Sequence, residues 1–363
     1  MKCEVLVDWF TFSVKVNSPD EVIKDWLGMN PDVFEAFPYG INGYLQSKRF
    51  SSIIVAYNGY ENDFFSRADM GVCVSMSGEG CRAFERFSSL GFTGLFRKLF
   101  ENMVEVREDS GEVAETLKKR KDCICNVSRV DVACDDKRVG KDSGQLDMDT
   151  LLEKAYFHHD FNSRMQYVTL DAKKFGDEFR GKTLYIGAPS SSFHIRFYDK
   201  AEEQKDKGIW KRSAKGHWIR AEMVMRGENA RGFVFQAAQA ESIGKLAGQI
   251  LNDKFRFIER DDNNISRCSV CDWWASFVEE VESVVIWSRS VIQHPLYRVE
   301  NWLRLQVSSS MAMIALTMGF ERLRDIVTEG KGHLSRKQEA LVHDFHAQRA
   351  AVRAEYATVP SCV

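Results

Sequence analysis

The sequence predicts an α+β fold: an antiparallel sheet over most of the chain, followed by a helical region at the C-terminal end. Runs rich in β-branched and aromatic residues recur along residues 1–260 and have the alternation typical of strands. Helical segments do not alternate regularly with them, so the strands are expected to form antiparallel meanders and not βαβ units. From residue 272 onward, apolar residues recur almost entirely at helical spacing.

The predicted elements follow from the period of the apolar residues. In the first strand, Val5, Val7 and Trp9 are expected on one face, with Phe10 and Phe12 on the other. Segment 111–121 is predicted as a helix because its acidic residues precede its basic ones, which suits the helix dipole. The strands are expected at 1–12, 51–57, 71–78, 124–136, 164–171, 182–188, 192–200 and 217–227, and the helices at 81–103, 111–121, 149–157, 228–253 and 272–287.

The chain is expected to form two domains. Its 363 residues are enough for two or three domains. The short, polar and turn-rich segment 261–266 predicts the linker. We therefore expect a first domain over residues 1–262 and a helical C-terminal region over residues 263–363.

Composition excludes several classes of protein. The 50 Lys and Arg nearly balance the 52 Asp and Glu, so a nucleic-acid partner requires a local basic surface. No run of 18 apolar residues is present, and the acidic N-terminus lacks the features of a signal peptide. Nine scattered cysteines predict free thiols in a reducing, cytoplasmic compartment. The Cys268-x-x-Cys271 pair has no second half at zinc-site spacing, so we interpret it as chance proximity.

Three predicted strands carry polar side chains on one face. Such a face is often only solvated, but three neighbouring strands with the same pattern would gather these side chains into a site. The polar residues are His194, Arg196, Tyr198 and Lys200 in one strand, Arg129, Asp131 and Asp135 in another, and Arg220, Glu222 and Arg226 in the third.

These residue types suit phosphoryl transfer. A tyrosine phenolate can attack a phosphodiester and hold a covalent intermediate. Carboxylate oxygens, here Asp131, Glu222 and Asp135, would hold Mg²⁺ or Mn²⁺ in preference to Zn²⁺. Guanidinium groups such as Arg196 and Arg220 match the non-bridging phosphate oxygens.

A local basic stretch lies beside this face in the sequence. Residues 205–220 hold six Lys and Arg against one acid, with tryptophans interleaved. Cations on phosphates and aromatic rings under bases are typical of single-strand binding. An exposed loop with inward-packed tryptophans is an equally good interpretation. The candidate DNA-binding residues are Lys205, Lys207, Trp210, Lys211, Arg212, Lys215 and Trp218.

Four ordered blocks resemble the Rep_trans family, which comprises rolling-circle replication initiators of plasmids, related relaxases and replication proteins of filamentous phages. The blocks are GVCVSMSGEGCRAFE (71–85), NVSRVDVACDD (126–136), TLYIGAPSSSFHIRFYDK (183–200) and WIRAEMVMRG (218–227). The length and helical tail most resemble the filamentous-phage members. The resemblance implies an antiparallel-sheet catalytic domain of rolling-circle initiator type over residues 1–262.

The resemblance also implies roles for single residues. Tyr198 would be the nicking tyrosine, flanked by Arg196 and Lys200, and Asp131 and Glu222 would be the acidic residues of the active site. The Gly78 to Arg82 block would be a structural turn, in which we expect Gly80 to adopt a positive φ. The His-hydrophobic-His metal motif of many rolling-circle nickases is absent from the sequence, which favours a site led by carboxylates.

The implied activity is metal-dependent nicking and rejoining of single-stranded origin DNA through a 5′-phosphotyrosine intermediate. The implied partners are origin DNA, a host helicase of the UvrD/Rep class and a second copy of the chain. A conjugative relaxase that nicks a transfer origin is the alternative with the same chemistry. A non-catalytic DNA-binding regulator on the same fold is the alternative from another class.

Overall fold

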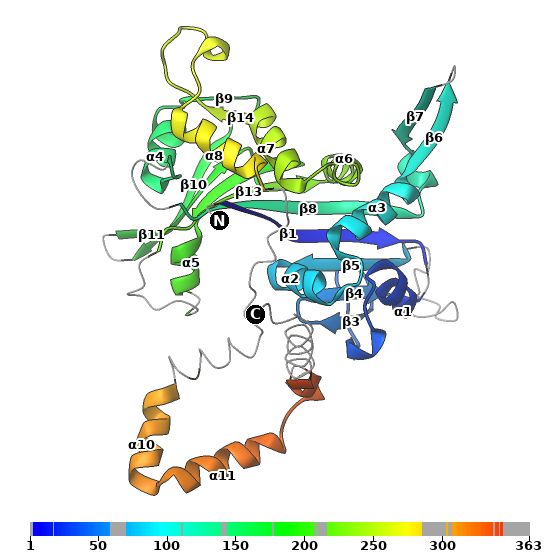
Figure 1. Cartoon of the computed structure of the whole chain (residues 1–363), viewed down its shortest axis with the longest axis vertical. Helices are drawn as coiled ribbons and strands as arrows, with labels where there is room; N and C mark the ends of the chain where they lie inside the picture. Colours follow the sequence, from blue (N-terminus) through cyan, green and yellow to red (C-terminus); the bar gives the residue numbers. More distant parts are fainter. Residues whose placement is uncertain are drawn as a thin grey trace, which may run out of the picture. The chain divides into compact units, whose positions relative to one another are not determined.

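A ten-stranded antiparallel sheet is built from strands within residues 3–226 (Figure 1). The computed structural model describes residues 3–16, 18–58, 70–109, 112–138, 144–175, 178–206, 208, 216–284, 303, 307–336, 338–340 and 342–343. The strand order is β10-β11-β12-β13-β8-β1-β5-β4-β3-β2, and each neighbouring pair is antiparallel. The predicted α+β class with an antiparallel sheet is therefore confirmed.

Two meanders flank the two long central strands, β1 and β8. One meander is made by β2 to β5 and the other by β10 to β13. The strands are β1 (Cys3–Val14), β2 (Glu35–Phe37), β3 (Gln46–Phe50), β4 (Ile53–Tyr57), β5 (Val72–Ser77), β8 (Cys125–Asp136), β10 (Val168–Phe175), β11 (Glu178–Ile186), β12 (Phe193–Asp199) and β13 (Ile219–Arg226). A separate small sheet pairs β9 (Phe161–Ser163) with β14 (Phe255–Phe257).

Helices cover one face of the large sheet and bury the apolar side of its strands. Phe10 of β1 packs on Phe96 of α3 at 5.3 Å between ring centroids, and Phe197 of β12 packs on Trp274 of α8 at 6.1 Å. The other face carries the polar side chains. The helices are α1 (Pro19–Glu21), α2 (Gly78–Phe87), α3 (Gly91–Met103), α4 (Met148–Leu152), α5 (Lys200–Asp206), α6 (Glu228–Ala237), α7 (Ile243–Lys254), α8 (Asp272–Glu282), α10 (Ser308–Met318) and α11 (Phe320–Lys331), with short 3₁₀ or π turns at 22–26, 31–33, 120–122, 153–157 and 265–267.

A β-bulge in β1 reverses the alternation predicted for the first strand. The register with β8 shifts between Val7 and Trp9, so Asp8 is the extra residue. Val5 and Val7 point into the core before the bulge, and Phe10 and Phe12 do so after it. The expectation that Trp9 shares a face with Val7 was therefore wrong, because a bulge places two residues opposite one partner residue.

The helix predicted for residues 111–121 was also wrong. Segments β6 (Val104–Asp109) and β7 (Glu112–Leu117) form an antiparallel hairpin instead, with Val104 opposite Leu117. Only two residues, Ser110 and Gly111, separate the two strands in the sequence, and a two-residue connection that contains glycine is a strong hairpin signal. Pairing with the neighbouring strand outweighs the weak preference that the order of charges gives to a helix.

The chain divides into two compact units. The first contains residues 1–203 and 215–289, and the second contains residues 204–214 and 290–363. Helix α8, which the sequence assigned to the C-terminal region, belongs to the first unit and buries Trp274 and Phe277 in its core. The first unit thus extends past residue 262. None of the helices in the described part of the chain is long and apolar enough to cross a membrane.

Candidate active site

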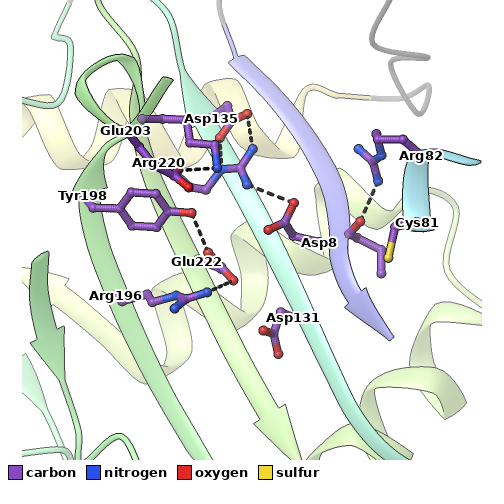
Figure 2. A network of polar contacts seen from close by, with 12 residues as sticks. Asp8, Cys81, Arg82, Asp131, Asp135, Arg196, Tyr198, Glu203, Arg220 and Glu222 are labelled. Atoms are coloured by element: carbon purple, nitrogen blue, oxygen red, sulfur yellow. Dashed lines mark hydrogen bonds and ion pairs between the residues drawn. The ribbon is translucent and has the colours of Figure 1, made fainter. Parts of the chain in front are cut away.

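The three strands singled out by their polar residues are neighbours in the sheet, as predicted. Strand β13 lies between β12 and β8. Tyr198 is the cross-strand partner of Arg220, and Arg220 is in turn the partner of Asp135. Arg196 is the partner of Glu222. Cross-strand partners share a face of the sheet, so these side chains gather opposite the helical layer (Figure 2).

Glu222 links the tyrosine to a guanidinium group. The Tyr198 hydroxyl donates to Glu222 Oε2 at 2.9 Å, and Arg196 Nη2 donates to Glu222 Oε1 at 2.6 Å (Figure 2). Burial raises the pKa of Tyr198 well above its usual value, although the nearby Arg220 charge opposes this. The tyrosine is therefore a neutral phenol at rest, with a carboxylate oxygen in place to receive its proton.

Arg220 holds two carboxylates from two different strands. Its Nε and Nη2 donate to Asp135 at 2.6 and 2.9 Å, and its Nη1 lies 3.0 Å from Asp8 Oδ1. Burial by itself would raise the pKa of Asp8, but the charges of Arg220 and Lys200 lower it below its usual value. Asp8 is therefore ionised, and the three groups form a buried ion cluster beside the tyrosine ring.

Asp131 of β8 is the carboxylate that lies close enough to Glu222 to feel its charge. Arg129 donates Nε and Nη2 to its two oxygens at 2.9 and 2.6 Å. Burial raises the pKa of Asp131 to about 6, and the charge of Glu222 contributes in the same direction. Two such crowded, desolvated carboxylates provide oxygen donors of the kind that Mg²⁺ and Mn²⁺ prefer. Within the described ranges, no group of three or more candidate ligands is close enough to hold a metal ion.

Asp135, which the sequence suggested as a third metal ligand, has a different partner in the structure. It is fully buried and gives both oxygens to Arg220. It also lies four residues from Asp131 along β8, about 13 Å away at the usual rise of a strand. The polar alternation placed it on the correct face but could not show that an arginine on the next strand occupies it.

Lys200 lies at the edge of the site. Its Nζ is 5.5 Å from the centroid of the Tyr198 ring and 2.5 Å from Glu203 Oε2. The ion pair with Glu203 is local to helix α5, because the two residues are three apart in sequence. Lys200 therefore adds positive charge beside the ring and makes no ion pair with Glu222 or Asp131 in the described part of the chain.

Asp8 is the residue of the site that sequence analysis missed. Its bulge is held by α2, because Arg82 Nη2 donates to the carbonyl oxygen of Val7 at 2.5 Å and to Glu85 at 2.8 Å. The family-like block 78–82 thus acts on the site through the backbone of β1.

Gly80 does not have the positive φ that the sequence suggested, since it is not among the residues in that region. A Cβ there would lie 2.3 Å from the carbonyl oxygen of Ser52. The glycine is required by close packing of α2 against the turn before β4, and not by its own backbone conformation.

The predicted DNA-binding stretch is described only at its two ends. Lys207, Trp210, Lys211, Arg212 and Lys215 lie outside the described residues. Lys205 is near the end of α5, and the ring of Trp218 lies under Lys137 Nζ at 4.4 Å from its centroid. Trp218 is half-buried, so it packs against its own molecule at least in part.

Comparison with known proteins defines the class of this chain. The model of the replication initiation factor family matches residues 125–329, which is more than half of the chain. The model of the N-terminal domain of rolling-circle replication initiation proteins matches residues 4–98. The first matched segment contains β8, β12 and β13, and the second contains the bulged strand β1. The chain belongs to the replication initiation factor family.

Two relatives illustrate the range of the family. The chain is 24% identical over 341 residues to the "Putative DNA relaxase NicK" of Bacillus subtilis (strain 168), covering 90% of this chain and 86% of the relative. It is 25% identical to the rolling-circle replication initiator protein of Geobacillus stearothermophilus, whose solved structure superposes with a TM-score of 0.59 over 77% of this chain and 97% of that one. The fold and the family-like motifs identified in the sequence are thereby confirmed.

Proposed function

We propose that this protein starts rolling-circle replication by nicking and rejoining single-stranded DNA at an origin, with Tyr198 as nucleophile. The observation that carries the proposal is the hydrogen bond of 2.9 Å from the Tyr198 hydroxyl to Glu222, on a sheet face lined with guanidinium groups. The proposal is also supported by membership of the replication initiation factor family.

The chemistry follows from the partners of Tyr198. Its phenolic oxygen attacks the phosphorus while Glu222 Oε2 accepts the phenolic proton. The bond from phosphorus to the 3′-oxygen breaks and the 3′-oxygen takes up a proton from solvent, to which Glu222 in turn releases the phenolic proton. This leaves a 5′-phosphotyrosine and a free 3′-OH for a polymerase to extend. Arg196 keeps Glu222 in place through the bond of 2.6 Å and offers its remaining N–H groups to the phosphate oxygens. Attack by the 3′-OH reverses these events and rejoins the strand.

Asp131 and Glu222 would hold the divalent cation, Mg²⁺ or Mn²⁺. When bound, such an ion supplies Lewis-acid stabilisation of charge on the phosphate. Burial raises the pKa of Asp131 to about 6 and the negative charge of Glu222 adds to this shift, so a bound cation would favour the ionised form of Asp131. Asp135 is left out of this ligand set because it lies four residues from Asp131 along β8, about 13 Å away at the usual rise of a strand.

The test is a nicking assay on supercoiled DNA that carries the inverted repeats of the host element, with Mg²⁺ or Mn²⁺. The wild-type protein should nick it and remain covalently attached to the 5′ end, whereas Tyr198→Phe should bind without forming the adduct. Tyr185→Phe is the matched control, because Tyr185 is the cross-strand partner of Arg196 on the same face. An adduct that persists in Tyr198→Phe and disappears in Tyr185→Phe would show that Tyr185, and not Tyr198, is the nucleophile.

A conjugative relaxase is the second candidate, and it is favoured by the name of the Bacillus subtilis relative. Nicking alone does not distinguish the two, because both use the same chemistry. Expressing the protein in a cell that carries a plasmid with the nicked site separates them. Replication of the plasmid in that cell supports an initiator, and transfer of the plasmid to a second cell supports a relaxase.

Origin DNA, a host helicase of the UvrD/Rep class and a second copy of the chain are the partners we propose for the initiator, in the cytoplasm of a bacterial host. Lys205, Trp218 and the basic residues between them are the proposed contacts to DNA. A second copy would supply the nucleophile that ends a round of replication. Copurification of the helicase with the nicked complex, and the mass of the free protein in solution, test these assemblies.

A further inference from the structure

A second group of cations lies on the polar face of the sheet, away from the tyrosine. Arg226 of β13 is the direct cross-strand partner of Arg129 of β8. Like charges that face each other in an antiparallel pair destabilise the sheet. A position of this kind is easier to understand if a third group of opposite charge binds to it.

The two arginines are held in different ways. Arg129 has a carboxylate partner, Asp131, and its guanidinium lies 4.3 Å from the centroid of the Trp9 ring. Arg226 donates Nη1 to the carbonyl oxygens of Pro189 and Ser191 at 2.9 and 3.0 Å. No ion pair of Arg226 occurs among the residues that the structure describes. The two carbonyl groups therefore fix the position of this guanidinium without neutralising its charge.

The groups around Arg226 leave one positive charge in excess. Arg129, Arg196 and Arg226 face two carboxylates, Asp131 and Glu222. His194 of β12 also lies on this face. It is buried and adds no charge near neutral pH, because burial and these arginines lower its pKa to about 4.

The arginines are also accessible to a ligand. The side chains of Arg129 and Arg196 are 26% and 30% exposed, although the carboxylates that they hold are almost fully buried. Arg226 is half-buried. The carboxylates therefore lie beneath the guanidinium groups, which present their outer N–H groups to solvent, as a site for an anion requires.

The position of Arg226 relative to Tyr198 indicates how far a bound ligand would extend along the sheet. Tyr198 is opposite Arg220, six residues before Arg226 on the same strand. Six residues of a strand span about 20 Å. Arg196 lies between the two ends, next to Glu222. The cations thus follow the strands away from the nucleophile in a line, which matches a chain of phosphates better than a single anion.

We infer that Arg226, together with Arg129 and Arg196, forms a phosphate-binding subsite for the backbone of the nucleic-acid single strand that flanks the scissile phosphodiester. This inference rests on the proposed function, since it takes Tyr198 as the point where the strand is cut. Guanidinium forks bind phosphate oxygens in pairs, and Arg226 is already oriented by its two carbonyl partners.

The test measures binding of a fluorescent (dT)12 strand in the Tyr198→Phe background, at several salt concentrations. Adding Arg226→Gln should weaken binding about tenfold and lower the slope of log K against log salt by about 0.7, the value for one phosphate contact on a single strand. Arg226→Lys should retain the slope. A slope unchanged in Arg226→Gln would overturn the inference.

Arg256→Gln is the matched control, because it removes the same charge on the opposite side of the sheet. Its strand β14 packs Phe255 and Phe257 against Phe197, which alternates with Tyr198 along β12. This variant should bind as the parent does. Inorganic phosphate is a second probe: competition with the strand at millimolar concentration would indicate a site for an isolated anion and would also overturn the inference.

The failure of the inference can be distinguished from failure of the proposed function. If the wild-type protein forms the covalent adduct but Arg226→Gln keeps the full salt slope, only the phosphate subsite is wrong. If the slope changes but no adduct forms on origin DNA, the proposed chemistry is wrong. The thermal unfolding temperature of Arg226→Gln and Arg226→Lys shows whether loss of the carbonyl contacts, and not of the charge, accounts for weaker binding.

Discussion

Glu222 is the side chain on which the chemistry depends most, because it accepts from both Tyr198 and Arg196. Glu222→Gln keeps the size of the side chain but cannot take up the phenolic proton. We expect the single-turnover rate of adduct formation to fall about 100-fold or more, while binding of the single strand changes little. Glu259→Gln is the control, since Glu259 is exposed and pairs with Lys154. A rate within twofold of wild type would show that another group accepts the proton.

His194 makes stability depend on pH in a direction that can be worked out. Burial, with the charges of Arg226 and its neighbours, lowers its pKa to about 4 from 6.5. The unfolded chain therefore binds more protons between these values, so this histidine makes the fold less stable as pH falls through that window. Its contribution changes by about 2 kcal/mol between pH 8 and pH 5.

The histidine must be isolated by a variant, because other groups have the opposite effect. Burial raises the pKa of Asp131 to about 6 and of Glu85 to about 7, so their contributions decrease as pH rises. The measurement is urea unfolding of wild type and His194→Gln at pH 5 and pH 8. The free energy of unfolding should decrease less from pH 8 to pH 5 in the variant than in the wild-type protein. Identical changes in both proteins would mean that the pKa of His194 is the same in the folded and unfolded chain, which would contradict the lowered value.

At the scale of elements, the bulge in β1 connects a helix to the active site. Arg82 of α2 donates to the carbonyl oxygen of Val7, next to Asp8, and Asp8 in turn pairs with Arg220. Arg82→Met should loosen Asp8 and lower the rate of nicking about tenfold, with little change in strand affinity. Asp8→Asn should have the same pattern. A loss of affinity equal to the loss of rate would point instead to a direct DNA contact.

Packing of α2 gives a separate prediction for stability. Gly80→Ala should destabilise the protein by about 2 kcal/mol, because the new Cβ would lie 2.3 Å from the carbonyl oxygen of Ser52. Gly232→Ala is the control on α6, where no atom lies within 4 Å of the added group. It should stabilise the helix by about 0.5–1 kcal/mol. Thermal unfolding of both variants tests the pair, and an equally stable Gly80→Ala would contradict the close approach.

The elements also show what the sequence could and could not predict. The strands with Tyr198, Glu222 and Asp131 were predictable, because a period of two is visible in the sequence whatever their neighbours are. Asp8 was not, since a bulge changes the face of one residue and is set by the partner strand and by Arg82. The pairing of Asp135 with Arg220 depends on the register between strands, which no single strand contains.

At the scale of the whole molecule, the boundary between the two units decides where the chain can be shortened. Helix α8 buries Trp274 and Phe277 within the first unit, and Trp274 lies 6.1 Å from Phe197, directly behind the strand that carries Tyr198. In the second unit, by contrast, Leu316 is 85% exposed and Phe320 is 77% exposed.

A chain that ends at residue 265 should therefore aggregate, because it lacks α8 and uncovers the aromatic side of β12. A chain that ends at residue 289 keeps every element of the first unit and should fold and form the covalent adduct on a single-stranded origin oligonucleotide. Size-exclusion chromatography and adduct formation test the two chains side by side. A monodisperse, active protein that ends at 265 would show that α8 is not part of the catalytic core. An aggregated protein that ends at 289 would show that the second unit is required for the first to fold.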